Sequence, residues 1–401
     1  MQYDVLVIGA GPAGSAAARQ AALQGLSVAL VDRAEFPRDK VCGDGLIADA
    51  LHAIDALGLS ARVAACATPV SGVRLYAPDG TTVPLDGHCL CVPRRVLDSI
   101  LCDAAIEAGA QFIAPAKAVA PLVEQEIVRG AIVVNQRTEQ RTQIRGRVTM
   151  LATGAAADSL QKFDVCRRSE PSATAARIYV DVPPDVARRF RELVISFDAS
   201  MLPGYGWIFP SGPTTLNVGV GLFYDAWRPA VSRNVRVLLE TFLASLPAGA
   251  NPLPHATLQT PLRGAPLRTS LQGARLARPG LLVIGEAAGL TYSLTGEGIG
   301  KAMESALLAA DLAARHLRNG GNADAALASA YETELTRRYA RKFKGYKQAQ
   351  DWMNSRRLAN YLARRANAGR FVRGQLEGMF ADTVDPQRLL SPLGLVRAIL
   401  Q

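Results

Sequence analysis

Three closely spaced glycines between a strand and a helix constrain this chain more than any other feature. Gly9, Gly11 and Gly14 follow the apolar run 3–8, which is typical of a buried parallel strand, and precede an alanine-rich helical stretch. The next strand ends at Asp32. The glycines allow a tight turn, a close approach of backbone to a pyrophosphate and close packing of helix on strand. The N-terminus of the helix can bind a phosphate, and the carboxylate of Asp32 can bind ribose hydroxyls, so the unit predicts a dinucleotide site.

Two later stretches point to the kind of dinucleotide. The string ATG at 152–154 follows an apolar strand, and VIGEAAGLTYSLTGEGIGKAMES spans 283–305. Together with Arg94 in VPRRVLD, they resemble the p-hydroxybenzoate hydroxylase superfamily of FAD enzymes. In that superfamily an apolar strand ending in GDAAG meets the ribityl chain and pyrophosphate, and Glu286 replaces the usual aspartate here. The resemblance implies that the cofactor is FAD.

The same resemblance implies that a helix starts beside the flavin ring. Gly296 and Gly298 leave room for backbone near the isoalloxazine, and the N-terminus of the expected helix 298–318 favours the reduced-flavin anion. The cofactor-binding residues expected in this way are Gly9, Gly11, Pro12, Ala13, Gly14, Asp32, Arg33, Cys42, Gly43, Arg94, Gly154, Gly285, Glu286, Gly296, Gly298 and Ile299.

Three further motifs resemble the geranylgeranyl reductase family, over roughly residues 1–330. They are Pro37-x-x-Lys40-x-Cys42-Gly43-Asp44-Gly45, Tyr205-x-Trp207-x-Phe209-Pro210 followed by Asn217-Val218-Gly219-x-Gly221, and LTGEGI at 294–299. Members of that family hydrogenate C=C bonds of isoprenoid chains with a reduced flavin. The resemblance therefore implies hydrogenation of a long apolar, isoprenoid (polyprenyl) substrate.

The aromatic motif provides the expected substrate wall. Side chains alternate along a strand, so Tyr205, Trp207 and Phe209 share one face. The resemblance implies that these three residues line the substrate cavity, and an oxygen-poor aromatic wall suits an apolar chain. An ordinary sheet core would show the same alternation, and it stays open as the alternative.

Cys42 is the first catalytic candidate, with Tyr205 and Trp207 as the others. Flanking glycines give the thiol space, and the nearby positive charge of Lys40 favours thiolate. In an alkene reduction flavin N5 delivers hydride to one carbon and an acid protonates the other, so Cys42 could position the substrate or donate that proton. The alternative is a buried, inert thiol, the commonest fate of a free cysteine.

The expected architecture is α/β, with a Rossmann-type FAD-binding domain, an inserted antiparallel β-sheet substrate domain and a helical, basic C-terminal segment. The expected bounds are 1–65, 92–158 and 270–325 for the discontinuous FAD-binding domain, 66–91 and 159–269 for the substrate domain, and 326–401 for the C-terminal segment. A helix is also predicted over 184–194. No second GxGxxG motif occurs, so the electrons are expected from a transiently docked NADPH or a reduced electron-transfer protein.

Positive charge is concentrated near the C-terminus. The whole chain has a net charge of +10, and residues 331–401 hold 14 Lys or Arg against six Asp or Glu. One interpretation is a helix packed on the FAD domain with a solvated basic face. The other is contact of 337–373 with anionic lipid headgroups or an acidic carrier protein. A nucleic-acid partner is not expected, because the basic run has no recognised binding motif.

Composition excludes several other classes. Six cysteines are thinly spread and four histidines are scattered, so neither a disulfide scaffold nor a metal site is expected. No uninterrupted apolar run reaches the ~18 residues of a membrane span, and the chain starts in a strand rather than in a signal peptide. We therefore expect a cytoplasmic protein that at most associates with a membrane surface.

Three rival functions remain open at this point. A monooxygenase of the same superfamily, acting on an aromatic or polyketide, would carry the same FAD motifs. A flavin-dependent halogenase has a related WxWxIP string, but it relies on a lysine beyond the flavin, and no lysine occurs between Lys40 and Lys117. A flavin-bearing redox sensor would not need the aromatic string. The strings KVCGDG and YGWIFP favour the reductase.

Overall fold

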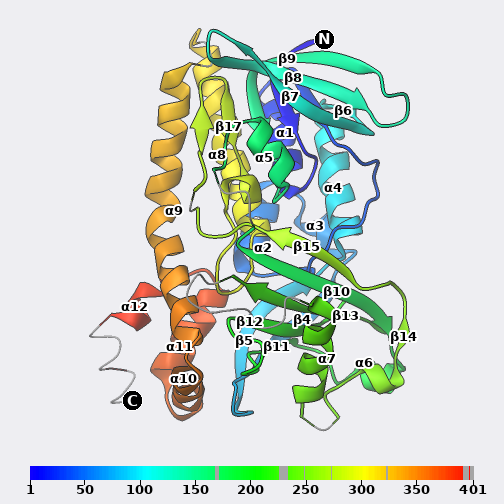
Figure 1. Ribbon diagram of the computed structural model, residues 1–401, viewed down its shortest axis with the longest axis vertical. Coiled ribbons are helices and arrows are strands. Elements are labelled where there is room, and N and C mark those ends of the chain that lie inside the picture. Colours follow the sequence, from blue (N-terminus) through cyan, green and yellow to red (C-terminus); the bar gives the residue numbers. More distant parts are fainter. Residues whose placement is uncertain are drawn as a thin grey trace.

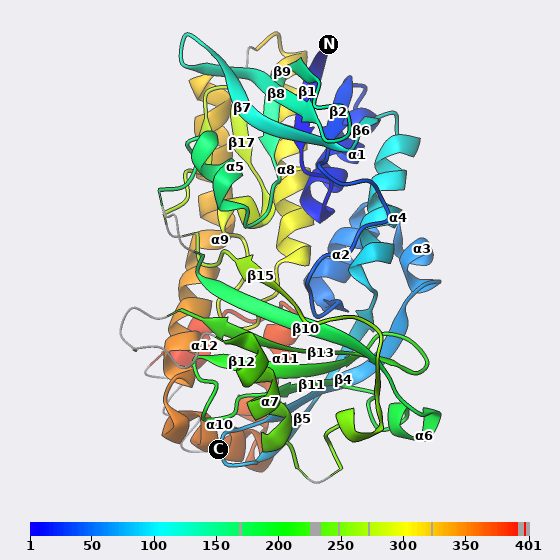
Figure 2. The same ribbon diagram turned by 45° about the vertical axis from the view of Figure 1, so that its right-hand side comes forward.

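Two β-sheets and their helices make up a computed structural model that describes residues 1–167, 171–224, 234–247, 249–271, 273–321, 324–391 and 397. Figures 1 and 2 show the first sheet and its helices at one end of the molecule and the second sheet at the other. This arrangement confirms the expected α/β class.

The first sheet contains the predicted strand–helix–strand unit. Its order is β16-β17-β9-β1-β2-β6, with β7 and β8 added through β9. The strands β17, β9, β1, β2 and β6 are parallel, and the centre of β1 is completely buried. The strands are β1 (Gln2–Ile8), β2 (Val28–Val31), β6 (Gln111–Ile113), β7 (Ala116–Glu124), β8 (Ile127–Asn135), β9 (Arg141–Leu151), β16 (Ala277–Arg278) and β17 (Leu281–Val283).

The second sheet is antiparallel apart from one parallel pair. Its order is β14-β10-β13-β12-β11-β4-β5-β3, and β15 also pairs with β10. The parallel pair joins β11 to β4. The strands are β3 (Gly45–Leu46), β4 (Thr68–Tyr76), β5 (Thr82–Cys91), β10 (Ala173–Asp181), β11 (Leu193–Ser196), β12 (Gly204–Pro210), β13 (Thr215–Phe223), β14 (Thr257–Leu258) and β15 (Arg263–Leu267). The domain bounds given above remain a prediction; β3, from within 1–65, pairs in this second sheet.

Helices cover the first sheet and continue past the second. They are α1 (Pro12–Leu23), α2 (Ala48–Ala56), α3 (Ser60–Ala64), α4 (Arg94–Glu107), α5 (Ala157–Lys162), α6 (Pro184–Ala187), α7 (Val235–Ser245), α8 (Ile299–Arg318), α9 (Ala325–Met353), α10 (Arg356–Ala368), α11 (Arg370–Phe380) and α12 (Gln387–Leu390), with short 3₁₀ turns η1 (Leu253–His255) and η2 (Gly285–Ala288). In the described part of the chain, no helix is long and apolar enough to cross a membrane.

The helix predicted over 184–194 is wrong for most of its length. Only α6 forms, and Leu193 already belongs to β11. The residues of β11 are buried and pair with β4 on one side and β12 on the other. Pairing with strands that are distant in sequence thus outweighs the local helical pattern, because tertiary contacts often decide the secondary structure of a short segment.

The C-terminal helices connect the two sheets. Tyr339, Phe343 and Tyr346 of α9 lie in the same hydrophobic core as the first sheet. Leu362 and Val372, from α10 and α11, pack in the core of the second sheet. Figure 1 shows α9 running along one side of the molecule, from the first sheet towards the second. A C-terminal helix therefore packs on the first sheet, as expected, while residues 392–396 and 398–401 of the segment lie outside the described residues.

The close approach of α1 to β1 provides a test of the fold. A Cβ on Gly14 would lie 1.6 Å from the carbonyl oxygen of Gly9. We expect Gly14→Ala to lower the free energy of unfolding by at least about 3 kcal/mol, because backbone must move to relieve the overlap. A Cβ on Gly374, in the helix α11, would have nothing within 4 Å, so Gly374→Ala should stabilise by about 0.5–1 kcal/mol. Urea unfolding of both variants, followed by circular dichroism, checks this; equal stabilities would contradict it.

Candidate functional site

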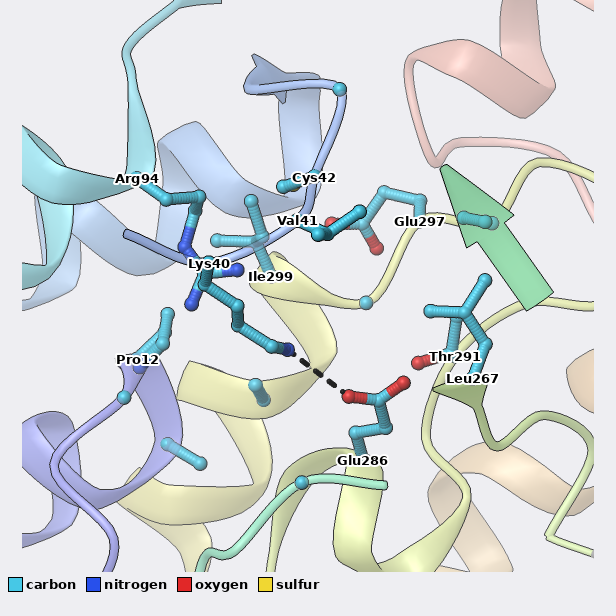
Figure 3. A pocket seen from close by; sticks show the side chains of 18 of the residues that line it. Pro12, Lys40, Val41, Cys42, Arg94, Leu267, Glu286, Thr291, Glu297 and Ile299 are labelled. Carbon is cyan, nitrogen blue, oxygen red and sulfur yellow. Dashed lines mark hydrogen bonds and ion pairs between the residues drawn. The ribbon is translucent and has the colours of Figure 1, made fainter. Parts of the chain in front are cut away.

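A cavity of about 440 Å³ lies between the two sheets. Its wall has two chemical halves. Charged side chains such as Asp32, Arg38 and Glu286 line one half, and aromatic and aliphatic side chains line the other. Figure 3 shows part of this wall from close by, with Arg94, Lys40 and Glu286 in view. A cavity of this kind can hold a polar nucleotide and an apolar molecule side by side.

The charged half begins at the N-terminus of α1. Gly11 is the residue before this helix, Pro12 takes its first position, and no side chain caps the free backbone N–H groups. Asp32 accepts hydrogen bonds from the backbone N–H of Ala10, at 2.7 Å, and of Ala34, at 2.9 Å. The uncapped helix end attracts an anion, and the fixed carboxylate can receive hydroxyl donors.

A buried ion pair holds Arg94 at the edge of the cavity. Its Nε and Nη2 donate to the two carboxylate oxygens of Asp98 at 2.7 and 2.8 Å, and Arg38 Nη1 lies 3.1 Å from the same carboxylate. Burial disfavours the charge of Arg94, but Asp98 and the thiol of Cys42 outweigh it and raise its pKa above the usual value. The guanidinium is therefore a permanent positive charge beside Cys42.

Glu286 and Lys40 meet across the cavity. Lys40 Nζ lies 3.2 Å from Glu286 Oε2, as the dashed line in Figure 3 marks. The other carboxylate oxygen accepts from the backbone N–H of Arg268 at 3.3 Å. The longer carboxylate at this position thus lies on the cavity wall, within reach of the PxxKxCG motif.

The aromatic half is built from one face of β12. The rings of Tyr205, Trp207 and Phe209 follow one another, with centroids 6.1 and 6.4 Å apart, and all three line the cavity. A Cβ on Gly43 would lie 2.9 Å from the ring of Phe209, so only glycine lets the loop that carries Cys42 lie against this wall. The alternation predicted for the YxWxFP string is therefore present.

A hydrogen-bond junction joins the Cys42 loop to the second sheet. Asn217, on β13, donates to the Cys42 carbonyl oxygen and to Asp44 Oδ2, each at 2.8 Å, and accepts from Trp207 Nε1 at 3.0 Å. The hydroxyl of Tyr179 donates to the same Asp44 oxygen. Burial raises the pKa of Asp44 to about 6, although these hydrogen bonds favour its charge.

Nearly all the site residues expected from the sequence share this cavity. Gly9, Gly11, Pro12, Ala13, Asp32, Arg33, Cys42, Gly43, Arg94, Gly154, Tyr205, Trp207, Phe209, Glu286, Gly296, Gly298 and Ile299 line it. The cavity wall does not include Gly14 or Gly285, where a Cβ would meet neighbouring backbone or Ala13, so both act through packing. The roles of these residues remain a prediction.

Sequence reasoning missed several residues of the wall. Phe380, at the end of α11, reaches the cavity from the C-terminal segment, which none of the motifs includes. Glu297 also lines it, next to two glycines that had been singled out. Arg38 lies between two motif residues, and its only sequence signal was the surrounding PxxKxCG string. Tyr179 carried no sequence signal; it lies outside the cavity wall and acts on the site through its hydrogen bond to Asp44.

The residues present fit FAD. An uncapped helix N-terminus, a carboxylate held by backbone donors and a fixed guanidinium lie along one half of a single cavity. Such a set suits a pyrophosphate and a ribose. The start of α8, with Gly298 before it, lies at the junction with the aromatic half, and the positive end of the helix dipole suits an electron-rich ring.

Comparisons with known proteins agree with this site. Residues 2–201 match a family model described as an FAD binding domain. The menaquinone reductase of Mycolicibacterium smegmatis is 33% identical over 85% of this chain and 82% of its own. The digeranylgeranylglycerophospholipid reductase of Methanosphaerula palustris is 30% identical over 82% of this chain and 80% of its own.

Solved structures share the fold. A geranylgeranyl bacteriochlorophyll reductase-like protein from Thermoplasma acidophilum superposes with a TM-score of 0.80 and 23% identity, over 100% of this chain and 96% of its own. Flavin-dependent halogenases have the same fold at 15–21% identity. The fold alone therefore does not separate reduction from halogenation.

The buried carboxyl of Asp44 gives the protein a specific pH dependence. Between its ordinary pKa of 3.8 and about 6, the folded protein holds a proton on Asp44 that the unfolded chain has released. This group's contribution to the free energy of unfolding therefore falls as pH rises through that window, by about 3 kcal/mol. Asp44→Asn should lack this fall, and Asp86→Asn, at an exposed position, should keep it. Urea unfolding of FAD-saturated proteins across the window checks this; identical slopes in all three would contradict it.

Proposed function

Because this chain belongs to the geranylgeranyl reductase family of FAD-dependent oxidoreductases, we propose that it hydrogenates C=C bonds of a long apolar, isoprenoid (polyprenyl) substrate. One observation carries the proposal: a single cavity joins the charged, nucleotide-like half to an aromatic wall, and Cys42 lies between them. The names of the relatives support an isoprenoid lipid or quinone as the substrate class.

The residues divide the work as follows. When bound, reduced FAD would supply the hydride that adds to one carbon of the double bond. The N-terminus of α1, Asp32 and Arg94 bind the nucleotide, and Glu286 binds the ribityl chain. Tyr205, Trp207 and Phe209 hold the apolar chain and exclude water from it. The Cys42 Sγ holds the proton that goes to the second carbon, since an unactivated alkene accepts hydride only with an aligned acid.

The electron donor we propose is NADPH, docking transiently, or a reduced electron-transfer protein. The single dinucleotide motif of the sequence leaves no second nucleotide domain for a resident donor. We keep contact of 337–373 with anionic headgroups or an acidic carrier as a proposal, together with a cytoplasmic location at a membrane surface. Exposed Arg356, Arg357, Arg364 and Arg370 on α10 and α11 support it.

The halogenase alternative has less support at the cavity. Among its described lining residues, the lysines are Lys40 and Lys117, both outside the aromatic wall. Lys40 pairs with Glu286, and Lys117 pairs with Asp158. A lysine beyond the flavin, which halogenation needs, is therefore not among the described residues of the aromatic half. The mass of the product distinguishes the monooxygenase alternative from the reductase.

The reaction predicts a defined product mass. Under anaerobic conditions, reduced enzyme mixed with a polyprenyl lipid should give a product heavier by two hydrogens for each bond reduced, with flavin reoxidised in step. Mass spectrometry of the lipid, paired with flavin absorbance, makes the measurement. A product that gains oxygen under air, or halogen when halide is present, in place of hydrogen would rule out the reductase.

The proposed proton donor can be tested by deletion of its thiol. Cys42→Ala should keep FAD and fold normally, while substrate reduction slows by about 10²-fold or more, because general acid catalysis contributes on that scale. Flavin reduction by the donor should be unchanged. Cys42→Ser should recover little, since a hydroxyl is a weaker acid. Stopped-flow measurement of both half-reactions decides, with Cys66→Ala, an exposed cysteine, as the matched control. Full activity in Cys42→Ala would show that the thiol is not the proton donor and that the residue only packs within its loop.

A further inference from the structure

Two buried carboxyl groups face each other behind the aromatic cavity. Glu297 lies two residues before α8 and lines the cavity, and Asp49 belongs to α2. Both are at least nine-tenths buried. One oxygen of each accepts from backbone: Glu297 Oε1 from the N–H of Gly300 at 2.9 Å, and Asp49 Oδ1 from the N–H of Ala50 at 2.8 Å. The remaining oxygens, Glu297 Oε2 and Asp49 Oδ2, accept no hydrogen bond from the described residues.

A shared proton resolves this arrangement. Both side chains lie against Gly300, whose N–H binds Glu297 Oε1 and whose Cα faces the Asp49 carboxyl, and two ionised carboxylates there would offer only acceptors. One proton between them makes one group the donor and removes the repulsion of two buried like charges. Gly300 permits the contact, because a Cβ there would lie 2.6 Å from Asp49 Oδ2. Burial, followed by the charge of Asp49, raises the pKa of Glu297 well above its usual value, which agrees with a protonated group.

The pair continues into a second group of charges. Lys301 is almost fully buried, and its Nζ lies 3.4 Å from Asp49 Oδ2, 2.8 Å from Glu304 Oε1 and 3.0 Å from Asp382 Oδ2. Lys342 also pairs with Asp382. The oxygens of Asp49, Glu304 and Asp382 lie close enough for a metal ion, but the ammonium of Lys301 already supplies positive charge there.

This second group opens into a different cavity. Lys301, Glu304, Lys342 and Asp382 line a space of about 390 Å³ that shares no described lining residue with the first cavity. Glu304 and Asp382 are partly exposed, whereas Asp49 and Glu297 are buried, and Lys301 is the ammonium that reaches Asp49, so full ionisation of the inner pair would leave a buried negative charge uncompensated. A retained proton at the inner end is the least costly arrangement.

We propose that Glu297 and Asp49 form the inner end of a proton path that leads from the substrate cavity, past the ammonium of Lys301, to the second cavity. This deepens the proposed function and rests on it: each double bond takes up one hydride from reduced flavin and one proton. When the acid that protonates the substrate has lost its proton, Glu297 replaces that proton at the cavity wall. Asp49 reprotonates Glu297, and Glu304 and Asp382, whose oxygens lie within 4.8 Å of an Asp49 oxygen, pass the next proton inward from solvent. Lys301 keeps its own proton, because its burial is outweighed by the three carboxylates, which raise its pKa above the usual value. Figure 3 shows the Glu297 carboxyl on the same side of the cavity as Val41 and Cys42.

Infrared spectroscopy of the resting, FAD-loaded protein tests the shared proton without substrate. At a pH well above 6, where Asp44 has ionised, the wild-type protein should show a carbonyl band of a protonated carboxylic acid that shifts in D₂O. Glu297→Gln and Asp49→Asn should each lose it, while both keep a side chain of the same shape. Glu334→Gln is the matched control: hydrogen bonds from Arg337 and Arg338 lower the pKa of this exposed carboxyl to about 2, so it is ionised and the band should stay. A band that persists in both inner variants would overturn the proposal.

Multiple-turnover kinetics tests the path itself, because the path refills the proton only after the first substrate has been reduced. Glu297→Gln and Asp49→Asn should bind FAD normally and accept electrons, but slow repeated substrate reduction by about 10²-fold, with a larger solvent isotope effect than the wild type. Glu334→Gln should match the wild type. If either inner variant lost the band but kept wild-type turnover, the proton path would be overturned, whereas the proposed reaction would be unaffected. A wild-type protein that has the band but reduces no alkene would contradict the proposed reaction, with the shared proton supported.

Discussion

The burial of one carboxylate, that of Asp44, holds the two halves of the molecule together at the site. Its loop follows the second Rossmann strand, and its oxygens accept from the backbone N–H of Arg94, at 3.2 Å, and from Asn217 and Tyr179 of the second sheet. The dinucleotide layer and the aromatic wall therefore meet through a carboxyl that water cannot reach. The position of Cys42, two residues earlier, follows from this junction, because Asn217 also binds its carbonyl oxygen.

The hydrogen bonds of Asp44 explain why the charged half and the aromatic half of the cavity adjoin each other directly. Arg38 and Arg94 share the carboxylate of Asp98, and Arg38 also lies 4.0 Å from Asp32 Oδ1, so each of these positive charges has a carboxylate beside it on the nucleotide side. Phe209 lies against Gly43 on the aromatic side, where any larger side chain would push the loop away. An apolar molecule and a charged nucleotide can then lie in contact at the one place where Cys42 lines the wall.

Features carried by neighbouring residues could be predicted from the sequence, and features assembled from distant segments could not. The glycine turn before α1, Asp32 and the one-sided ring stripe of β12 depend on spacing within a single element, and the structure has all of them. The helix expected over 184–194 failed because β4 lies more than a hundred residues away and still determines the pairing of β11. Glu297 and Asp49 are separated by most of the chain. Only the packing of α2 on α8 shows that their two carboxyl groups come together.

The long helix α9 has a mechanical consequence. At 29 residues it extends for about 44 Å, it contacts β16 and β17 of the first sheet, and it leads after a short break into α10, which contacts β5 of the second. A continuous helix resists bending, so it acts as a brace that fixes the angle between the two sheets. Hinge opening of the layers would strain this brace, so an apolar substrate of the proposed kind would have to enter by side-chain motion with the angle between the sheets unchanged. Phe380, on the helix that follows α10, lines the cavity, so the segment that braces the sheets also contributes to the wall of the site.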